Sequence, residues 1–97
     1  DSAPHARGAK ESDCGCAGVY SAHAAIELYT EAFDLAGALD KLEGFASEFG
    51  PRFYGLPPNE ERITLERKEW RAPERLPFGK DELIPLRAGE SIPWKLV

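Results

Sequence analysis

The sequence predicts a small structure that mixes α-helices with β-strands. Apolar residues recur at helical spacing over residues 21–50, and apolar and polar residues alternate along two stretches of residues 51–97. A chain of 97 residues buries only about 60–65% of its unfolded surface. That size suits a compact α+β module and excludes a complete barrel enzyme, which takes ~250 residues.

Residues 1–20, DSAPHARGAKESDCGCAGVY, have no periodic apolar pattern. Their small residues, glycines, single proline and scattered charges predict a long loop. Loops of this length are uncommon in compact domains, and those that occur are often functional. The alternative is a frayed N-terminus, which composition alone favours.

Residues 21–50 predict a pair of helices, the first over 21–36. Ser21 is the expected N-cap and Gly37 the expected end. One face of this helix carries apolar residues at spacings of four, three and four: Ala22, Ile26, Tyr29 and Phe33. The polar residues lie away from that face: Glu27, Thr30, Glu31 and Asp34. We therefore expect the apolar face to pack in the core.

The second helix is predicted over 38–49. Its apolar face consists of Leu39, Leu42, Phe45, Ala46 and Phe49. Gly50 and Pro51 are expected to end it, because glycine can take the left-handed C′ position and proline cannot continue a helix. Two short helices joined so closely should pack against something larger.

From Pro51 onwards the chain is predicted to be extended. In ERITLERKEW, Ile63 and Leu65 alternate with polar residues, which predicts a half-exposed strand. SIPWKL alternates again, and three of its residues are predicted to point inward: Ile92, Trp94 and Leu96. Pro93 confines this strand to a sheet edge or a short pairing, because proline has no N–H to donate.

The composition argues against several classes of function. A formal net charge of −5 without a basic stripe argues weakly against a nucleic-acid partner. No apolar run approaches the ~20 residues that span a bilayer. The first residues have neither the basic nor the apolar region of a signal peptide.

Cys14 and Cys16 stand one residue apart, a poor spacing for a structural disulfide. We therefore expect a reducing compartment. The two thiols could bind a metal, but the chain has no second cysteine pair at the spacing of a zinc finger. His23 lies on a predicted helix, away from other candidate ligands, and we expect a structural or surface role for it.

Asp1 and His5 are the residues whose types best suit a polar site. Pro4 restricts the backbone between them, so that a carboxylate and an imidazole can face one cavity. A carboxylate can bind a cation, and an imidazole can donate a hydrogen bond to an anionic ligand. The alternative is simple solvation near a terminus, which the pair alone does not exclude.

Three segments, read as strings, resemble one family. D-S-A-P-H, then basic residues, K-E and C-G-C-A-G follow in that order within residues 1–20. FGPRFYGLPPNEERITLERKEW and LIPLRAGESIPWKL add two further matching stretches. These segments resemble the shorter bacterial and fungal dihydroorotases, members of the amidohydrolase superfamily. The resemblance covers essentially the whole chain.

The resemblance implies an α/β fold class, as the C-terminal portion of a (β/α)8 metal-dependent hydrolase barrel. Within that single domain, residues 1–20 would follow the end of strand eight as an active-site loop, 21–50 would form the helical pair, and 51–97 an extended C-terminal segment. The implied reaction is the reversible cyclisation of N-carbamoyl-L-aspartate to (S)-dihydroorotate in pyrimidine synthesis.

The resemblance also implies roles for single residues. Asp1 would bind zinc and act as general base, and then as acid toward the departing ring nitrogen. His5 would bind the substrate carboxylate, and the backbone of Ala17 would contact the same substrate. Two zinc ions are implied per full-length subunit, with the other ligands, a carboxylated lysine among them, outside this chain.

The chain opens on Asp1 without an initiator methionine, which suggests a piece of a longer polypeptide. We therefore expect this chain alone to be inactive, with the remainder of the enzyme chain as its partner. A homodimer in the cytoplasm, acting on a small molecule and not on nucleic acid or membrane, is implied by the resemblance.

Two alternatives stay open. The chain could be a non-catalytic structural or assembly module of the same superfamily, although the presence of Asp1, His5 and C-G-C-A-G argues against loss of function. It could also come from a hydantoinase-like cyclic amidase. That group shares the aspartate after strand eight but not the P-H-A-R and C-G-C-A-G continuation.

Overall fold

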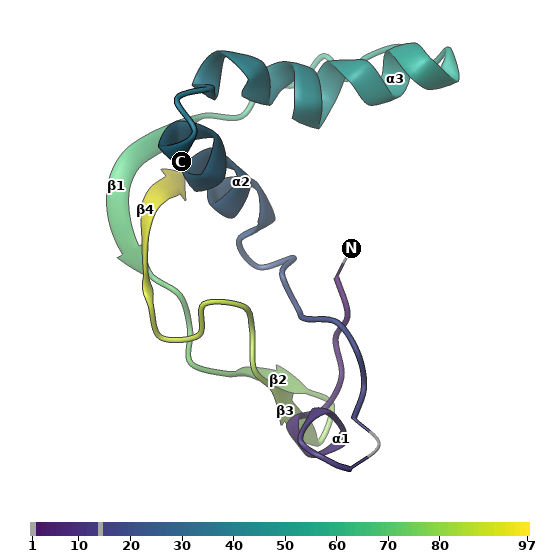
Figure 1. Cartoon of the computed structure of the whole chain (residues 1–97), viewed down its shortest axis with the longest axis vertical. Helices are drawn as coiled ribbons and strands as arrows, with labels where there is room; N and C mark the ends of the chain where they lie inside the picture. Colours follow the sequence, from purple (N-terminus) through teal and green to yellow (C-terminus); the bar gives the residue numbers. More distant parts are fainter. Residues whose placement is uncertain (1, 14) are drawn as a thin grey trace.

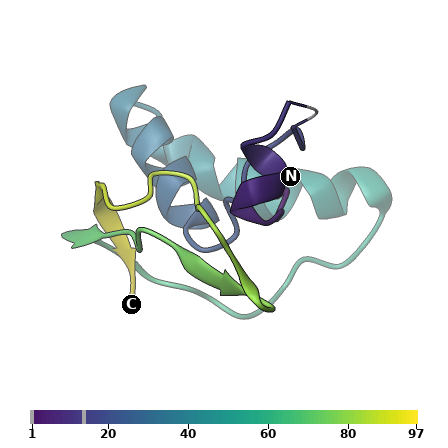
Figure 2. The same ribbon diagram turned by 90° about the horizontal axis from the view of Figure 1, so that it is seen from below.

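The computed structural model describes residues 2–13 and 15–97 of the chain. Helices lie on one side of two small antiparallel sheets, and the N-terminal loop lies near the second sheet (Figure 1, Figure 2). The helical elements are α1 (Arg7–Lys10), α2 (Ala25–Leu35), the 3₁₀ turn η1 (Leu39–Lys41), the π-helical turn η2 (Gly44–Glu48) and α3 (Phe49–Tyr54). The strands are β1 (Leu65–Arg71), β2 (Leu76–Phe78), β3 (Asp81–Leu83) and β4 (Ser91–Leu96).

The predicted strand near the C-terminus is confirmed as β4, which pairs antiparallel with β1. Arg67 lies opposite Trp94 and Trp70 opposite Ile92, so two residues of β1 face the single residue Pro93. Because proline cannot donate a ladder hydrogen bond, the pairing is interrupted there by a bulge. The sheet has two strands, so β4 is an edge strand, as Pro93 predicted.

A small core lies where α2 crosses this sheet. Ala24, Ala72 and Ile92 are buried there, with Leu28 and Trp70 packed against them. The prediction that Leu96 points inward is wrong, because its side chain is exposed, and Ile63 is exposed as well. Leu96 lies at the end of β4, and Ile63 precedes β1, where the two-stranded sheet offers no further layer to cover them.

The face of α2 that packs on the sheet is not the one that the apolar spacing predicted. Glu27 and Thr30, expected to face solvent, are buried, whereas Tyr29 is 44% exposed. Thr30 can be buried because its hydroxyl donates to the carbonyl of Ile26 over 2.6 Å, which satisfies the polar group. The apolar face instead meets Phe45, whose ring centroid lies 5.1 Å from that of Tyr29.

The start of α2 also differs from the prediction. The helix begins at Ala25, after a turn in which the N–H of Ala24 donates to the carbonyl of Ser21 over 3.2 Å. Ser21 is therefore not the N-cap. The amides of Ser21 and Ala22 instead donate to the hydroxyl of Ser2, over 3.2 and 3.3 Å, which ties the entry of the helix to the first residues described.

The second predicted helix does not end at Gly50 and Pro51. η2 runs directly into α3, which continues to Tyr54, so residues 51–54 are helical and not extended. Pro51 has no N–H to donate, and it follows the π-helical turn in which the amide of Phe49 donates to the carbonyl of Gly44, five residues earlier, so the regular α-helical hydrogen-bond pattern is already shifted there.

The residue that ends α3 is Gly55, at φ +66°. The amides of Gly55 and Leu56 donate to the carbonyls of Arg52 and Pro51, the hydrogen-bond pattern of a Schellman motif. Gly37, at φ +68°, ends α2 in the same left-handed conformation, and there the prediction is confirmed. Within the described residues no helix is long and apolar enough to cross a bilayer.

Candidate functional site

The N-terminal segment folds back on itself as a closed loop. The N–H of Ala3 donates to the carbonyl of Val19 over 3.0 Å. Gly18, at φ +87°, lies so near Ala3 that a Cβ on Gly18 would come within 2.5 Å of the Ala3 Cβ. The frayed-terminus alternative is therefore wrong for the part of this segment that the structure describes. We call residues 3–13 and 15–19 the closed loop.

His5 lies directly before Ala6, the N-cap residue of the single-turn helix α1. The carbonyl of Ala6, the next residue, accepts hydrogen bonds from the amides of Ala9 and Lys10 over 3.0 and 3.1 Å. Arg7 fixes the turn from outside, since its Nε donates to Glu11 over 3.0 Å and its Nη1 lies 3.9 Å from Glu82 of β3. The carboxylate of Glu11 raises the pKa of the Arg7 guanidinium.

The residues predicted for the site are placed as follows. His5 is half-buried, and its Nδ1 has no hydrogen-bond partner among the described residues. Ala17 is exposed in the same closed loop. Asp1 and Cys14 lie outside the residues that the structure describes. Cys16 is a free, half-buried thiol.

Lys10 is a further charged residue of the closed loop. Its ammonium donates to the carbonyls of Ala17 and Gly18, over 3.1 and 2.6 Å. This contact brings the end of α1 against the Ala17 segment and closes the loop from inside. Apolar periodicity could not reveal it, because the partners are backbone carbonyls seven and eight residues away.

His23 has the structural role that we expected. Its Nε2 lies 3.0 Å from the carbonyl oxygen of Leu86, and its ring stacks on Tyr20 at a centroid distance of 5.6 Å. The amide of Leu86 donates in turn to the carbonyl of Tyr20 over 2.7 Å. These contacts join the end of the closed loop to the C-terminal half of the chain.

Ionic contacts that join α2 to β1 and to the segment before β4 were missed in the sequence. Arg87 donates to Glu31 over 2.7 Å, and Arg67 donates to Asp34 over 2.7 and 3.3 Å. Arg67 also lies over the ring of Trp94, with 4.5 Å from its Cζ to the centroid. The polar face of α2 is thus an internal contact surface.

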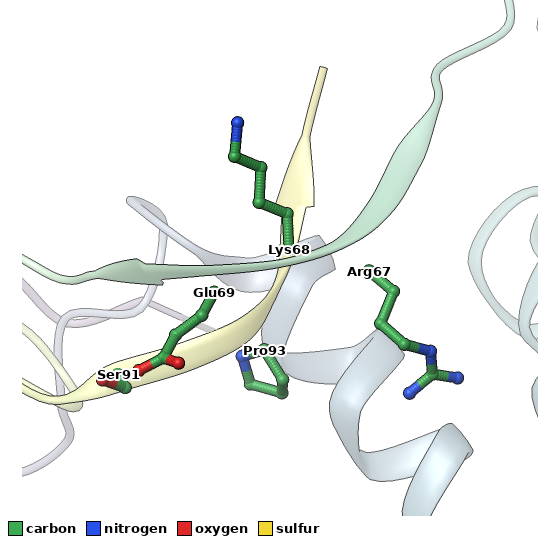
Figure 3. Close-up of a pocket in the computed structure, with 5 residues that line it drawn as sticks. All are labelled: Arg67, Lys68, Glu69, Ser91 and Pro93. Atoms are coloured by element: carbon green, nitrogen blue, oxygen red, sulfur yellow. The ribbon is translucent and has the colours of Figure 1, made fainter.

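Two surface pockets lie away from the closed loop. One, of about 390 Å³, is at the β-bulge, and its mixed charges come from Arg67, Lys68 and Glu69 (Figure 3). Lys68 projects to the opposite side of the strand from Glu69 (Figure 3). The other, of about 1120 Å³, is a groove between the η1–η2 segment and residues 57–65. Neither is lined by a residue predicted for the site.

Metal binding was tested against the ligand-type residues that the structure places. Among residues 2–13 and 15–97, no three His, Cys, Asp or Glu side chains cluster as they would around a metal ion. A closed structural zinc site takes four protein ligands and a catalytic one about three. The described part of the chain therefore does not form a metal site by itself, and most ligands would have to come from elsewhere.

No family model matches the chain, but it is similar along its whole length to curated proteins. It is 69% identical over 97 residues to a dihydroorotase of Pseudomonas aeruginosa (strain UCBPP-PA14). It is 65% identical over 96 residues to a dihydroorotase of Methylobacillus flagellatus. In both cases the chain spans 28% of the relative's own length.

Solved structures give the same result for the fold. All of the chain matches 28% of a Saccharomyces cerevisiae dihydroorotase in complex with 5-fluoroorotic acid, with a TM-score of 0.89 and 38% identity. It also matches 28% of a dihydroorotase from Campylobacter jejuni, with a TM-score of 0.80 and 33% identity. Along its whole length the chain is therefore similar to the C-terminal part of dihydroorotases.

Proposed function

We propose that this chain is the part of a dihydroorotase that carries one side of the active site. The whole protein, a longer chain that includes these residues, would cyclise N-carbamoyl-L-aspartate reversibly to (S)-dihydroorotate in pyrimidine synthesis. The observation that supports this most is 69% identity along all 97 residues to a curated dihydroorotase. The chain's likeness to a dihydroorotase solved with 5-fluoroorotic acid agrees with a pyrimidine carboxylate as ligand.

His5 is proposed to bind the carboxylate of the substrate. Its ring is half-buried, and the buried Nδ1 has no hydrogen-bond partner in the described part of the chain, so a ligand or the rest of the whole protein would have to supply one. A protonated or suitably tautomeric imidazole donates to a carboxylate, and a hydrogen bond to a charged group is worth roughly 1.5–3 kcal/mol. Ala17 is proposed to contact the same substrate through its exposed backbone.

Asp1 is proposed to bind a metal and to transfer the proton that ring closure and opening require. A carboxylate can accept the proton as base and return it to the ring nitrogen as acid, so one residue serves both directions. Zinc is the proposed metal, two ions per subunit, and it would polarise the amide carbonyl as a Lewis acid. The remaining ligands, including a carboxylated lysine, would come from the rest of the whole protein.

The rest of the whole protein is also the proposed partner of the exposed apolar surface. Phe53, Tyr54 and Leu56, at the end of α3, are 82%, 73% and 60% exposed. Large exposed apolar side chains grouped in this way mark a surface that contacts another part of a protein or a partner. We propose that a (β/α)8 barrel, of which this chain is the C-terminal portion, covers them, and that the separate chain is inactive.

The test uses the whole protein loaded with zinc and compares dihydroorotate with a plain hydantoin. We expect turnover of dihydroorotate, its loss on chelation of the metal, and a fall of about 10²–10⁴-fold in kcat for Asp1→Asn. Preferred turnover of the hydantoin would identify a hydantoinase-like enzyme. No turnover of either by the zinc-loaded protein would contradict an enzymatic function. Homodimerisation and a cytoplasmic location remain predictions, which sedimentation and cell fractionation can check.

A further inference from the structure

Lys10 holds two neighbouring carbonyls at the end of the closed loop. Its Nζ lies 3.1 Å from the oxygen of Ala17 and 2.6 Å from that of Gly18. An ammonium group has three donors, so these two bonds leave one donor without a partner among residues 2–13 and 15–97. Lys10 is half-buried, while the two residues that it holds are exposed. The loop around Ala17 is therefore fixed from its inner side.

Holding the two carbonyls also fixes the amides that follow them. Each peptide unit is planar, with its N–H pointing opposite to its C=O. When Lys10 binds the oxygens of Ala17 and Gly18, the amides of Gly18 and Val19 must point away from the ammonium. The left-handed φ of +87° at Gly18, against Ala3, allows these two planes to turn in this way. Lys10 thereby sets the orientation of the segment proposed to contact the substrate.

The charge of Lys10 is not neutralised within the described chain. Glu11, its neighbour, pairs with Arg7 over 3.0 Å. Among the residues that the structure places, no carboxylate forms an ion pair with Lys10, and its two bonds go to neutral carbonyls. A positive charge without a counter-ion beside a loop of exposed backbone favours an anion there.

We propose that Lys10 is a positioning residue for the substrate anion. It orients the Ala17–Gly18 backbone and adds a favourable field for the substrate's carboxylate, without transferring a proton itself. This inference rests on the proposed function, because it assumes that the Ala17 segment contacts an anionic cyclic amide. It predicts that Lys10 contributes to binding and not to the chemical step.

The experiment measures KM and kcat for dihydroorotate in the whole protein. In Lys10→Met, which removes the donors and keeps the apolar stem, we expect KM to rise about 10-fold with kcat within about 3-fold of the original. In Lys10→Arg, which keeps the charge and the donors, we expect KM within about 3-fold of the original. Lys80→Met, at an exposed turn between β2 and β3, removes the same charge elsewhere and should leave both constants within about 2-fold.

Inhibition constants for orotate and for uracil add a readout that a purely structural role would not move. We expect Lys10→Met to raise the inhibition constant of orotate about 10-fold. The inhibition constant of uracil, which lacks the carboxylate, should change by less than about 3-fold. Equal weakening of both, a fall in kcat at unchanged KM, or a Tm loss that Lys10→Arg does not restore would overturn the positioning role. If the unaltered protein does not turn over dihydroorotate, the proposed function fails first. The orotate titration of the two variants then still tests Lys10 as an anion-positioning residue.

Discussion

The indole Nε1 of Trp94 lies 3.3 Å from the Oδ2 of Asp34, on the same oxygen that Arg67 binds over 2.7 Å. One carboxylate of α2 thus accepts a hydrogen bond from each strand of the β1–β4 sheet. Since Arg67 also lies over the ring of Trp94, the three side chains form a connected group. This group joins the helix to the sheet through polar contacts, where an apolar contact was expected.

Asp34→Asn should therefore make stability less dependent on pH. Chiefly through its hydrogen bond, Arg67 lowers the pKa of the Asp34 carboxyl below its ordinary value. A lowered folded-state pKa contributes stability that is present above the unfolded-state pKa of about 3.9 and is lost as the pH falls through the folded value. We expect a lower Tm for Asp34→Asn at pH 7 and equal Tm values once both forms are fully acidified.

Melting curves of the whole protein from pH 7 downward would check this. Asp40→Asn is the matched control, because within the described part of the chain Asp40 forms an ion pair with Lys41 alone, over 3.7 Å, and both side chains are about three-quarters exposed. It should leave the Tm unchanged at every pH. A Tm difference for Asp34→Asn that persists at the lowest pH would show that Asn disturbs the packing and that the charge is not the cause.

Gly55→Ala should cost more stability than Gly50→Ala. Apart from chain neighbours, neither added Cβ would meet a heavy atom within 4 Å, so local backbone conformation decides the result. Gly50 is inside α3, where alanine is favoured by about 0.5–1 kcal/mol, but its position directly before Pro51 disfavours a Cβ in the helical conformation and offsets this gain. Gly55 has a φ of +66°, where an L-residue costs roughly 1–2 kcal/mol. Urea unfolding of the whole protein measures both, and the reverse order would place the helix end at Gly50 after all.

Ala24→Leu should destabilise the contact between α2 and the sheet. Ala24 has no exposed surface and packs with Ala72 and Ile92. Added methylene groups in a filled core typically cost 1–3 kcal/mol, so we expect about that loss in the free energy of unfolding. Ala36→Leu, at the exposed C-cap of α2, is the control and should cost less than about 0.5 kcal/mol. If both substitutions had equally small effects on the free energy of unfolding, α2 would pack on the sheet through the face that carries Tyr29 and Phe33.

Gly18→Ala should open the closed loop and impair the proposed site. The new Cβ would lie 2.5 Å from the Ala3 Cβ, at a φ of +87°, so either Ala3 or the Ala17–Gly18 backbone must move. We expect kcat/KM for dihydroorotate to fall at least about 10-fold, since small displacements of positioning groups have effects of that size or larger. Gly8→Ala, with nothing within 4 Å of the added Cβ, should leave kcat/KM unchanged. If both variants were equally active, the conformation of the closed loop would not matter for the proposed site.

The closed loop illustrates what sequence reading could and could not give. The order of its motifs, from His5 to Ala17, carried the resemblance to dihydroorotases, and the similarity of the whole chain to that family confirms it. The contacts of Lys10 within the loop and of Ser2 beside it had no periodic signal, because both side chains bind backbone groups. The roles proposed for Asp1, His5 and Ala17 remain predictions that the enzyme assays must test.

The sequence by itself determined local features whose cause is local. Gly37 ends α2 because only glycine takes that left-handed conformation cheaply, and Pro93 interrupts the β1–β4 ladder because it has no N–H. Only the tertiary structure decided which face of α2 is buried. There, hydrogen bonds and ion pairs from Thr30, Glu31 and Asp34 compensate the desolvation of polar groups. Polar residues could thus occupy a contact that apolar periodicity assigns to Tyr29 and Phe33.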